Sequence, residues 1–160
     1  MNIRIGNGFD IHRTAAGRKL FLGGVEIPSE VGLDGHSDAD ALLHALCDSL
    51  LGALALGDIG LHFPNTDERY RGIDSKKLLS HVYELVKEKG YRLINTDIMV
   101  ICERPKLLPY IQQMRETIAG LLECDSDRIS VKATTNEKLG SLGRGEGIAV
   151  YAVSLLEKAG

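Results

Sequence analysis

One aspartate and two histidines are the residues of this sequence most suited to hold a metal ion. Asp10 and His12 stand two positions apart after an apolar stretch, so in an extended chain their side chains project to the same side. His44 lies farther along, in a segment with helical periodicity. One carboxylate and two imidazoles fit a zinc ion whose fourth position stays open, as in catalytic zinc sites. A lone Asp-x-His pair more often marks a turn and a surface histidine, so the zinc prediction depends on His44 meeting the pair.

The residues just before that helical segment suit a different ligand, a phosphate. His36 and Ser37 precede the predicted helix start, where unpaired amides and the helix dipole favour an anion. Ser37 with Asp40 three residues later resembles a capping box, and apolar residues at helical spacing follow at once. We therefore predict a helix from this cap to about residue 57. Asp40, His44 and Asp48 should share its polar face, opposite the apolar stripe.

A second candidate phosphate site follows the β-rich residues 129–133. Thr134, Thr135 and Glu137 stand between that segment and the glycines of residues 143–147. Hydroxyls, a carboxylate and glycines suit a phosphate-binding turn, and Glu137 is available to a hard cation such as Mg²⁺. Composition alone favours the alternative, a flexible glycine loop.

Composition limits the class of protein. A chain of 160 residues with 44% hydrophobic and 26% charged residues predicts one soluble globular domain, residues 1–160. The net charge of −3 and the lack of a basic run argue against a nucleic-acid partner. No segment reaches the apolar length of a membrane span or resembles a signal peptide. Cys47, Cys102 and Cys124 are odd in number and unclustered, which favours a reducing compartment, the cytoplasm, over a disulfide framework.

Apolar periodicity predicts the elements that position these residues. Residues 97–102 carry apolar side chains on both faces, which predicts a central strand. Gly6 and Gly8 would let the first strand kink or let its backbone approach something closely before Phe9. Besides the helix that carries His44, we predict strands over 2–5, 91–103, 129–133 and 148–155, a hairpin over 19–22 and 25–27, loops over 29–34 and 58–67, a helix capped by Ser75 and stopped by Gly90, and a helix over 105–122 with Leu108 inward.

Five blocks of this sequence together resemble the 2-C-methyl-D-erythritol 2,4-cyclodiphosphate synthases. The blocks are residues 8–12, 35–40 with His44, 56–60, 132–140 and 143–147, and the resemblance spans residues 3–156. It implies a lyase of isoprene biosynthesis by the non-mevalonate pathway, which converts 4-diphosphocytidyl-2-C-methyl-D-erythritol 2-phosphate to the cyclic diphosphate and releases CMP. The substrate's own 2-phosphate would attack the β-phosphorus, so the protein needs no nucleophile and acts by positioning and charge neutralisation.

The resemblance also assigns roles to residues. Asp10, His12 and His44 would bind Zn²⁺, Glu137 would bind Mg²⁺ or Mn²⁺, and His36 and Thr135 would polarise the phosphates. The region around Asp58 would hold the sugar diol, and residues 102–108 with 133–134 would form a cradle for cytidine and phosphate. The positions that match the family's substrate contacts are Asp10, His12, His36, Ser37, Asp58, Ile59, Gly60, Phe63, Pro64, Asn65, Thr66, Asp67, Cys102, Glu103, Arg104, Pro105, Lys106, Leu107, Leu108, Ala133, Thr134, Thr135, Asn136, Glu137, Ser141 and Arg144.

The fold that the resemblance implies is α+β. A four-stranded mixed sheet would carry helices on one face, with a small hairpin apart. Three subunits would pack their sheets around a central apolar channel as a homotrimer, and each active site would be shared between neighbouring subunits. The apolar residues on both faces of the strand over 97–102 support this expectation, because three predicted helices cover only one sheet face.

The sequence differs from the commoner family pattern at a few positions, and two other functions stay open. Asn7, Asn65 and Asn136 replace residues that are frequent in the family, and Ser141-Leu142 replaces a pair containing the Phe that lines the channel. A nucleotide- or metal-binding module without catalysis would need the zinc ligands and the cytidine cradle but not His36 or Thr135. A zinc phosphohydrolase would need a general base beside the metal, for which Asp40 is the sole candidate.

Overall fold

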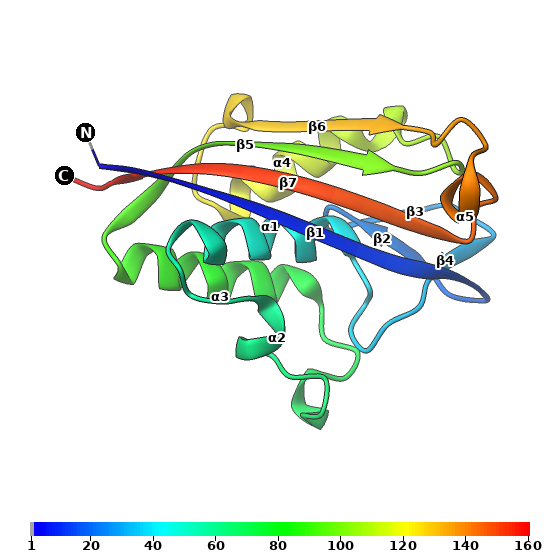
Figure 1. The fold of residues 1–160 in the computed structure, drawn as a ribbon, viewed down its shortest axis with the longest axis horizontal. Coiled ribbons are helices and arrows are strands. Elements are labelled where there is room, and N and C mark those ends of the chain that lie inside the picture. The colour runs from blue at the N-terminus through cyan, green and yellow to red at the C-terminus, as the bar shows by residue number, and fades with distance from the viewer. Residues whose placement is uncertain (1) are drawn as a thin grey trace.

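The computed structural model describes residues 2–160 and contains a curved mixed sheet of five strands (Figure 1). The strand order is β4-β1-β7-β5-β6, and β5 pairs with β6 in parallel while the other neighbours are antiparallel. The bounds are β1 (Ile3–Ala16), β4 (Val31–Leu33), β5 (Tyr91–Ile101), β6 (Ile129–Thr134) and β7 (Gly147–Lys158), with β2 (Leu20–Leu22) and β3 (Val25–Ile27) forming the expected separate hairpin.

The α+β class and the mixed sheet are confirmed, but the strand number of four is wrong. The fifth strand is β4, which lies in the segment predicted as a loop. It pairs with the end of β1, where Thr14 faces Leu33 and Ala16 faces Val31. A strand of three residues is too short for an alternating pattern to reveal it. The central position of β5, between β7 and β6, is confirmed.

Helices cover one face of this sheet. In Figure 1, α1 crosses β1 and β7, α3 lies outside α1, and α4 packs against β6. The bounds are α1 (Ala41–Ala53), α2 (Ile59–His62), α3 (Ser75–Glu88), α4 (Ile111–Leu121) and α5 (Gly140–Gly143), with single 3₁₀ turns η1 (Glu68–Tyr70), η2 (Leu108–Tyr110) and η3 (Ser126–Arg128). Within residues 2–160 no helix is long and apolar enough to cross a membrane.

The boundaries of α1 and α3 differ from the prediction. Asp40, not Ser37, caps α1, which ends at Ala53 instead of near residue 57. Asp74 caps α3, so Ser75 is its first helical residue, while Gly90 follows the end of α3 with the expected positive φ of 76°.

The predicted helix over 105–122 begins later than expected. A helix that started at Pro105 would place Pro109 in its interior, where proline lacks the N–H and collides with the preceding turn. Pro109 is instead the second residue of the short turn η2, and α4 starts at Ile111. Leu108, predicted to point inward, is consequently 79% exposed.

Two glycines bring α1 unusually close to β1. A Cβ atom on Gly8 would lie 1.9 Å from the carbonyl oxygen of Ala45, and one on Gly6 would lie 2.0 Å from that of Ser49. No side chain fits at these distances, which confirms the predicted close approach of the backbones. Because Gly8 and Asp10 share one face of β1, this contact also sets the distance between β1 and the helix that carries His44.

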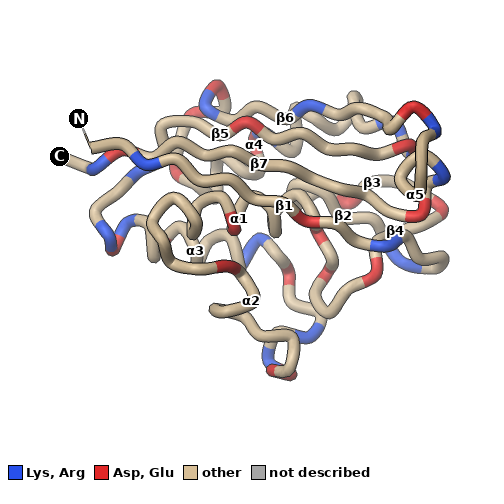
Figure 2. The backbone as a smooth tube through the Cα atoms, viewed as in Figure 1, with Lys and Arg blue, Asp and Glu red and all other residues tan. Residues whose placement is uncertain are grey.

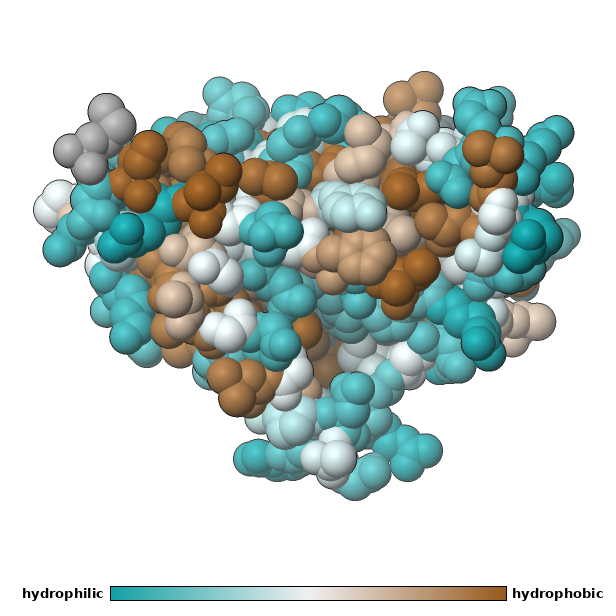
Figure 3. Space-filling view, in the orientation of Figure 1, coloured by the Kyte–Doolittle hydropathy of each residue, from teal (hydrophilic) through white to brown (hydrophobic). Residues whose placement is uncertain are grey.

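The opposite face of the sheet carries an apolar surface that no helix among the described residues covers. Its exposed members are Ile3, Ile5, Phe9 and Ile11 of β1 with Tyr151 and Val153 of β7. The rings of Phe9 and Tyr151 pack with centroids 4.8 Å apart. Figure 3 shows apolar (brown) side chains spread among polar ones over the face that is turned to the viewer, and Figure 2 shows that the middle of β7 carries no charge. We call these six exposed residues of β1 and β7 the outer sheet face.

Candidate functional site

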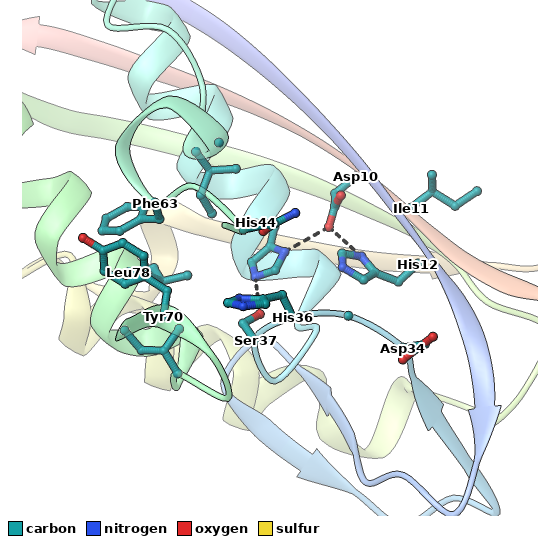
Figure 4. Close-up of a pocket in the computed structure, with 15 residues that line it drawn as sticks. Asp10, Ile11, His12, Asp34, His36, Ser37, His44, Phe63, Tyr70 and Leu78 are labelled. Carbon is teal, nitrogen blue, oxygen red and sulfur yellow. Dashed lines mark hydrogen bonds and ion pairs between the residues drawn. The ribbon is translucent and has the colours of Figure 1, made fainter. Parts of the chain in front are cut away.

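The three predicted metal ligands meet between β1 and the first turn of α1 (Figure 4). Asp10 Oδ2 lies 2.9 Å from His12 Nδ1 and 3.3 Å from His44 Nδ1. One ligand atom from each residue lies within 4.8 Å of the others, so a single ion could contact all three. Asp10 and His12 project to the same side of β1, as their spacing predicted. The convergence on which the metal prediction depended is therefore present.

The contacts inside this group leave buried atoms without hydrogen bonds. Among residues 2–160, Asp10 Oδ2 and His12 Nδ1 are the buried side-chain atoms that lack a hydrogen-bond partner. Such atoms are rare in folded proteins because each costs free energy, on the order of 1–3 kcal/mol. A divalent metal between them would satisfy both atoms, so the residues present fit a metal ion.

Burial and mutual contact also perturb the acid–base chemistry of the group. Burial opposes ionisation of Asp10, but contacts with His12 and His44 outweigh it and lower its pKa to about 2. Burial likewise opposes protonation of His44, but the neighbouring Asp10 carboxylate raises its pKa above the ordinary value. Asp10 is therefore an anionic ligand at neutral pH.

A cavity of about 320 Å³ opens beside the three ligands. The loop over residues 58–74 closes it, and Asp48 Oδ1 anchors that loop to α1 by accepting a hydrogen bond of 2.7 Å from Ile59 N. The predicted site residues that line the cavity are Asp10, His12, His36, Ser37, His44, Ile59, Gly60, Phe63 and Asn65. Asp34, Tyr70, Ile73 and Leu78 also line it, and no sequence pattern singled them out.

Four other predicted substrate contacts on this loop do not line the cavity: Asp58, Pro64, Thr66 and Asp67. Two of them have local partners. Asp58 Oδ1 accepts a hydrogen bond from Leu61 N and caps α2, and Asp67 forms an ion pair of 2.6 Å with Arg69.

The residues predicted to hold cytidine and phosphate form a second group at the ends of β5 and β6. Cys102 N donates to Thr134 O at 2.9 Å, and the Glu103 carboxylate accepts hydrogen bonds from Asn136 N at 3.3 Å and Lys138 N at 2.8 Å. These bonds join the two blocks. None of this group lines the cavity beside the metal ligands: Cys102, Glu103, Arg104, Pro105, Lys106, Leu107, Leu108, Ala133, Thr134, Thr135, Asn136, Glu137, Ser141 and Arg144.

Asp40 was predicted to lie on a polar helix face, and this prediction is wrong. The residue is fully buried. Its carboxylate accepts hydrogen bonds from Gly23 N at 3.0 Å, Gly24 N at 2.7 Å and Leu43 N at 3.0 Å. Burial raises its pKa to about 6 although these donors oppose the shift. Asp40 therefore clamps the β2–β3 hairpin to α1 and is absent from the cavity lining. The base that a zinc phosphohydrolase would need is not in place.

The start of α1 also differs from an open anion site. Ala39 N donates to Ser37 Oγ at 3.1 Å, and Asp40 N donates to Asp38 Oδ1 at 3.2 Å. Leu43 N is occupied by Asp40. These amides are satisfied by side chains, so an anion in the cavity would meet the side chains of His36 and Ser37, which line it.

Comparisons with known proteins agree along nearly the whole chain. The family model described as the YgbB family matches residues 3–157. A protein of Geobacter sulfurreducens named 2-C-methyl-D-erythritol 2,4-cyclodiphosphate synthase is 62% identical over 156 residues, which cover 98% of this chain and 99% of that protein.

Solved structures are similar as well. A synthase of the same name in a bound form with CDP is 42% identical, with a TM-score of 0.89 over 96% of this chain and 100% of that one. The IspF–CDP complex of Plasmodium falciparum is 37% identical, with a TM-score of 0.88 over 99% of this chain and 98% of that one.

Proposed function

The chain belongs to the YgbB family, and we propose that it is a 2-C-methyl-D-erythritol 2,4-cyclodiphosphate synthase, an enzyme of isoprenoid biosynthesis. It converts 4-diphosphocytidyl-2-C-methyl-D-erythritol 2-phosphate to the cyclic diphosphate and CMP. The observation that carries this proposal is that Asp10, His12 and His44 lie close enough beside a cavity to bind one metal ion. They do so in a chain that is highly similar to synthases of that name.

The reaction is an intramolecular phosphoryl transfer. An oxygen of the substrate's 2-phosphate forms a bond to the β-phosphorus of the diphosphate. The bond from that phosphorus to the oxygen bridging to the α-phosphate breaks, and this oxygen leaves with CMP. No protein nucleophile takes part, so the task of the chain is to hold two anionic groups in contact and to neutralise their charge.

Asp10, His12 and His44 are the residues that would hold Zn²⁺, because one carboxylate and two imidazoles with a fourth open position form a common catalytic zinc set. Glu137, with a hard carboxylate oxygen, would hold Mg²⁺ or Mn²⁺. Divalent ions bound there supply positive charge to the phosphates.

Residues of the cavity would position the reacting phosphates and the sugar. His36 and Ser37 line the cavity beside the metal ligands, where they can donate hydrogen bonds to phosphate oxygens. Ile59 and Gly60 line the part of the wall that would hold the sugar diol. The group at the ends of β5 and β6, with Thr135, would hold cytidine and the diphosphate. The two solved relatives described above as CDP complexes contain the corresponding portion of this substrate.

We further propose a homotrimer with shared active sites. The group with Thr135 and Glu137 lies outside the cavity formed by one chain, although the substrate must contact both regions. The outer sheet face is apolar and uncovered, as a surface that packs against other subunits would be. A threefold ring would cover this face and place the cytidine cradle of one subunit beside the metal ligands of the next.

Incubation of the purified chain with the cytidylyl substrate and divalent metal tests the activity. Phosphorus NMR should show CMP and a cyclic diphosphate forming in equal amounts. Free phosphate as the product would instead identify a phosphohydrolase. Bound but unchanged substrate would identify a binding module, and either result would refute the proposed function.

The variant His44→Ala tests the metal ligands. It removes one of three donors, so tightly bound zinc and nearly all cyclisation should be lost, a larger effect than the roughly 10–100-fold typical of groups behind a metal ligand. Circular dichroism should show an intact fold. His81→Ala is the control, because His81 is exposed on α3 outside the metal group and should leave the zinc content unchanged. Stoichiometric zinc in His44→Ala would overturn the assignment.

A further inference from the structure

The second ring nitrogen of His44 lies in a small buried network behind the metal ligands. His44 Nε2 is 2.9 Å from Ser75 Oγ and 3.1 Å from Ser37 Oγ. Ser75 is the first residue of α3 and is fully buried. Figure 4 shows the His44 ring between Asp10 on one side and Ser37 on the other. The network therefore joins the start of α3 to a metal ligand on α1.

The hydroxyl proton of Ser75 is committed to another partner. Ser75 Oγ donates to Asp38 Oδ1, and Ser75 N donates to Asp38 Oδ2 at 2.9 Å. The two bonds hold one residue by both its side chain and its backbone. An ionised carboxylate accepts hydrogen bonds and donates none, so the direction of the Ser75–Asp38 bond is fixed.

This direction determines the tautomer of His44. Because Ser75 Oγ gives its proton to Asp38, it can only accept at His44, so Nε2 must carry the imidazole hydrogen. The lone pair of neutral His44 is then on Nδ1, the nitrogen that faces Asp10 Oδ2. Ser37 Oγ accepts a hydrogen bond from Ala39 N and has a second lone pair that can accept from His44 Nε2, which is consistent with this assignment.

We propose that Asp38 and Ser75 are positioning residues of the metal centre, which hold His44 in the Nε2–H tautomer with Nδ1 aimed at the metal. Groups that hold the outer nitrogen of a histidine ligand typically change metal affinity by about 10–100-fold. The inference rests on the metal centre of the proposed function but does not require the cyclisation reaction itself.

Ser75→Ala provides the first test, because it removes the hydroxyl and leaves the backbone contact to Asp38 in place. Zinc affinity, measured by competition with a chromogenic chelator, should fall by about tenfold or more. Ser49→Ala is the matched control. Ser49 is also fully buried, and its hydroxyl bonds Leu46 O and Ser154 Oγ instead of His44, so zinc affinity should stay unchanged. Unchanged zinc affinity in Ser75→Ala, or an equal loss in both variants, would overturn the proposal.

The tautomer can be read directly in the zinc-loaded wild-type protein. Long-range ¹H–¹⁵N spectra should show the hydrogen of His44 on Nε2, with Nδ1 as the nitrogen whose signal the metal shifts. A hydrogen on Nδ1 overturns the proposal whether or not any variant folds. At limiting zinc, Ser75→Ala should show a smaller metal-bound fraction of His44 than the wild type.

Activity separates this proposal from the proposed function. At saturating zinc the kcat of Ser75→Ala should return close to the wild-type value, whereas a deficit that zinc cannot repair would contradict a role exerted through metal affinity. Neither the chelator titration nor the spectra use substrate. A chain that binds zinc through Nε2-protonated His44 but makes no cyclic product would refute the function and leave the positioning role intact.

Discussion

Glu137 is the one residue that we propose as a ligand of a second divalent ion. In the part of the chain that the structure describes, it lies on the loop after β6 with a positive φ of 51° and does not line the cavity beside the zinc ligands. Its role therefore stays a prediction.

Glu137→Gln should weaken the response of cyclisation to Mg²⁺ or Mn²⁺ far more than it changes zinc content, because an amide is a poorer ligand than a carboxylate for a hard cation. A metal titration of activity, with zinc measured on the same samples, checks this. Glu88→Gln, which removes an exposed carboxylate from α3, is the control. An unchanged titration curve for Glu137→Gln would contradict a two-metal site.

Asp40 gives a pH dependence whose sign is opposite to that of most carboxylates. Its pKa rises from 3.8 to about 6 on folding because the carboxyl group is fully buried. Between these values the folded protein holds more protons than the unfolded chain, so this contribution to stability is lost as pH rises through about 6. The shift corresponds to about 3 kcal/mol.

Asp40→Asn removes the titrating group and one acceptor, since its amide nitrogen cannot accept from Gly24 N. Urea unfolding of both proteins from about pH 4 to 7 measures the effect. The stability of the wild type relative to the variant should fall by about 3 kcal/mol over this range. A difference that does not vary with pH would show that Asp40 is ionised throughout.

Residue types and spacing were sufficient for the metal ligands but not for the groups around them. Asp10, His12 and His44 were predicted because strand and helix periods place their side chains. The bond between Asp38 and Ser75 joins residues 37 positions apart, and no local pattern signals it. Asp40 was misplaced because Ser37 offered an equally plausible helix cap in the same short segment.

At the scale of elements, long apolar periodicity predicted which segments are helices and strands, and local chemistry decided where they end. The helices α1 and α3 and the strands β5 and β7 were predicted because many residues contribute to the apolar pattern of each. The start of α4 and the strand β4 were missed because one proline and three residues, respectively, determine them. Short elements depend on their neighbours in space, which a single sequence does not display.

The packing of α1 on β1 should tolerate no side chain at Gly8. Gly8→Ala would place Cβ 1.9 Å from Ala45 O, so α1 must move away from β1, and overpacking of this kind costs roughly 1–3 kcal/mol. Because Ala45 follows His44, the variant should also bind zinc less tightly. Urea unfolding and chelator competition measure the two effects.

Gly120→Ala is the matched control for this prediction. Gly120 lies in α4 with no atom within 4 Å of its Cβ position, so alanine there should be neutral or stabilise by up to about 1 kcal/mol. If Gly8→Ala were as stable as Gly120→Ala, the backbones of α1 and β1 could not be in such close contact.

At the scale of the whole molecule, the sequence predicted an uncovered apolar sheet face but not its composition. The apolar residues on both sides of β5 indicated it, and the structure leaves Met99 and Ile101 only partly exposed on that side. Most of the exposed outer sheet face belongs instead to β1 and β7. Which strands border one another is a property of the chain's path, which no local sequence pattern shows.

If neighbouring subunits share an active site, as we propose, two inactive variants should rescue one another. His44→Ala removes a metal ligand, and Lys106→Glu alters the cytidine cradle, so mixed oligomers should contain some interfaces with two intact halves. Partial activity should therefore return after the variants are unfolded and refolded together. Light scattering should give the mass of a trimer. A monomeric mass in an active sample, or no rescue in properly mixed oligomers, would refute the shared site.

The odd-numbered and even-numbered residues of β1 point to opposite faces of the sheet and serve different functions. Ile5, Phe9 and Ile11 face the outer sheet face, while Gly8, Asp10 and His12 face α1 and the cavity. A shift of one residue in a strand exchanges its two faces. A slip of β1 by one residue against β7 would therefore turn the metal ligands outward and bury the aromatic ring of Phe9 at the same time. Both faces of β1 therefore depend on the register of the strand more than on any one of its side chains.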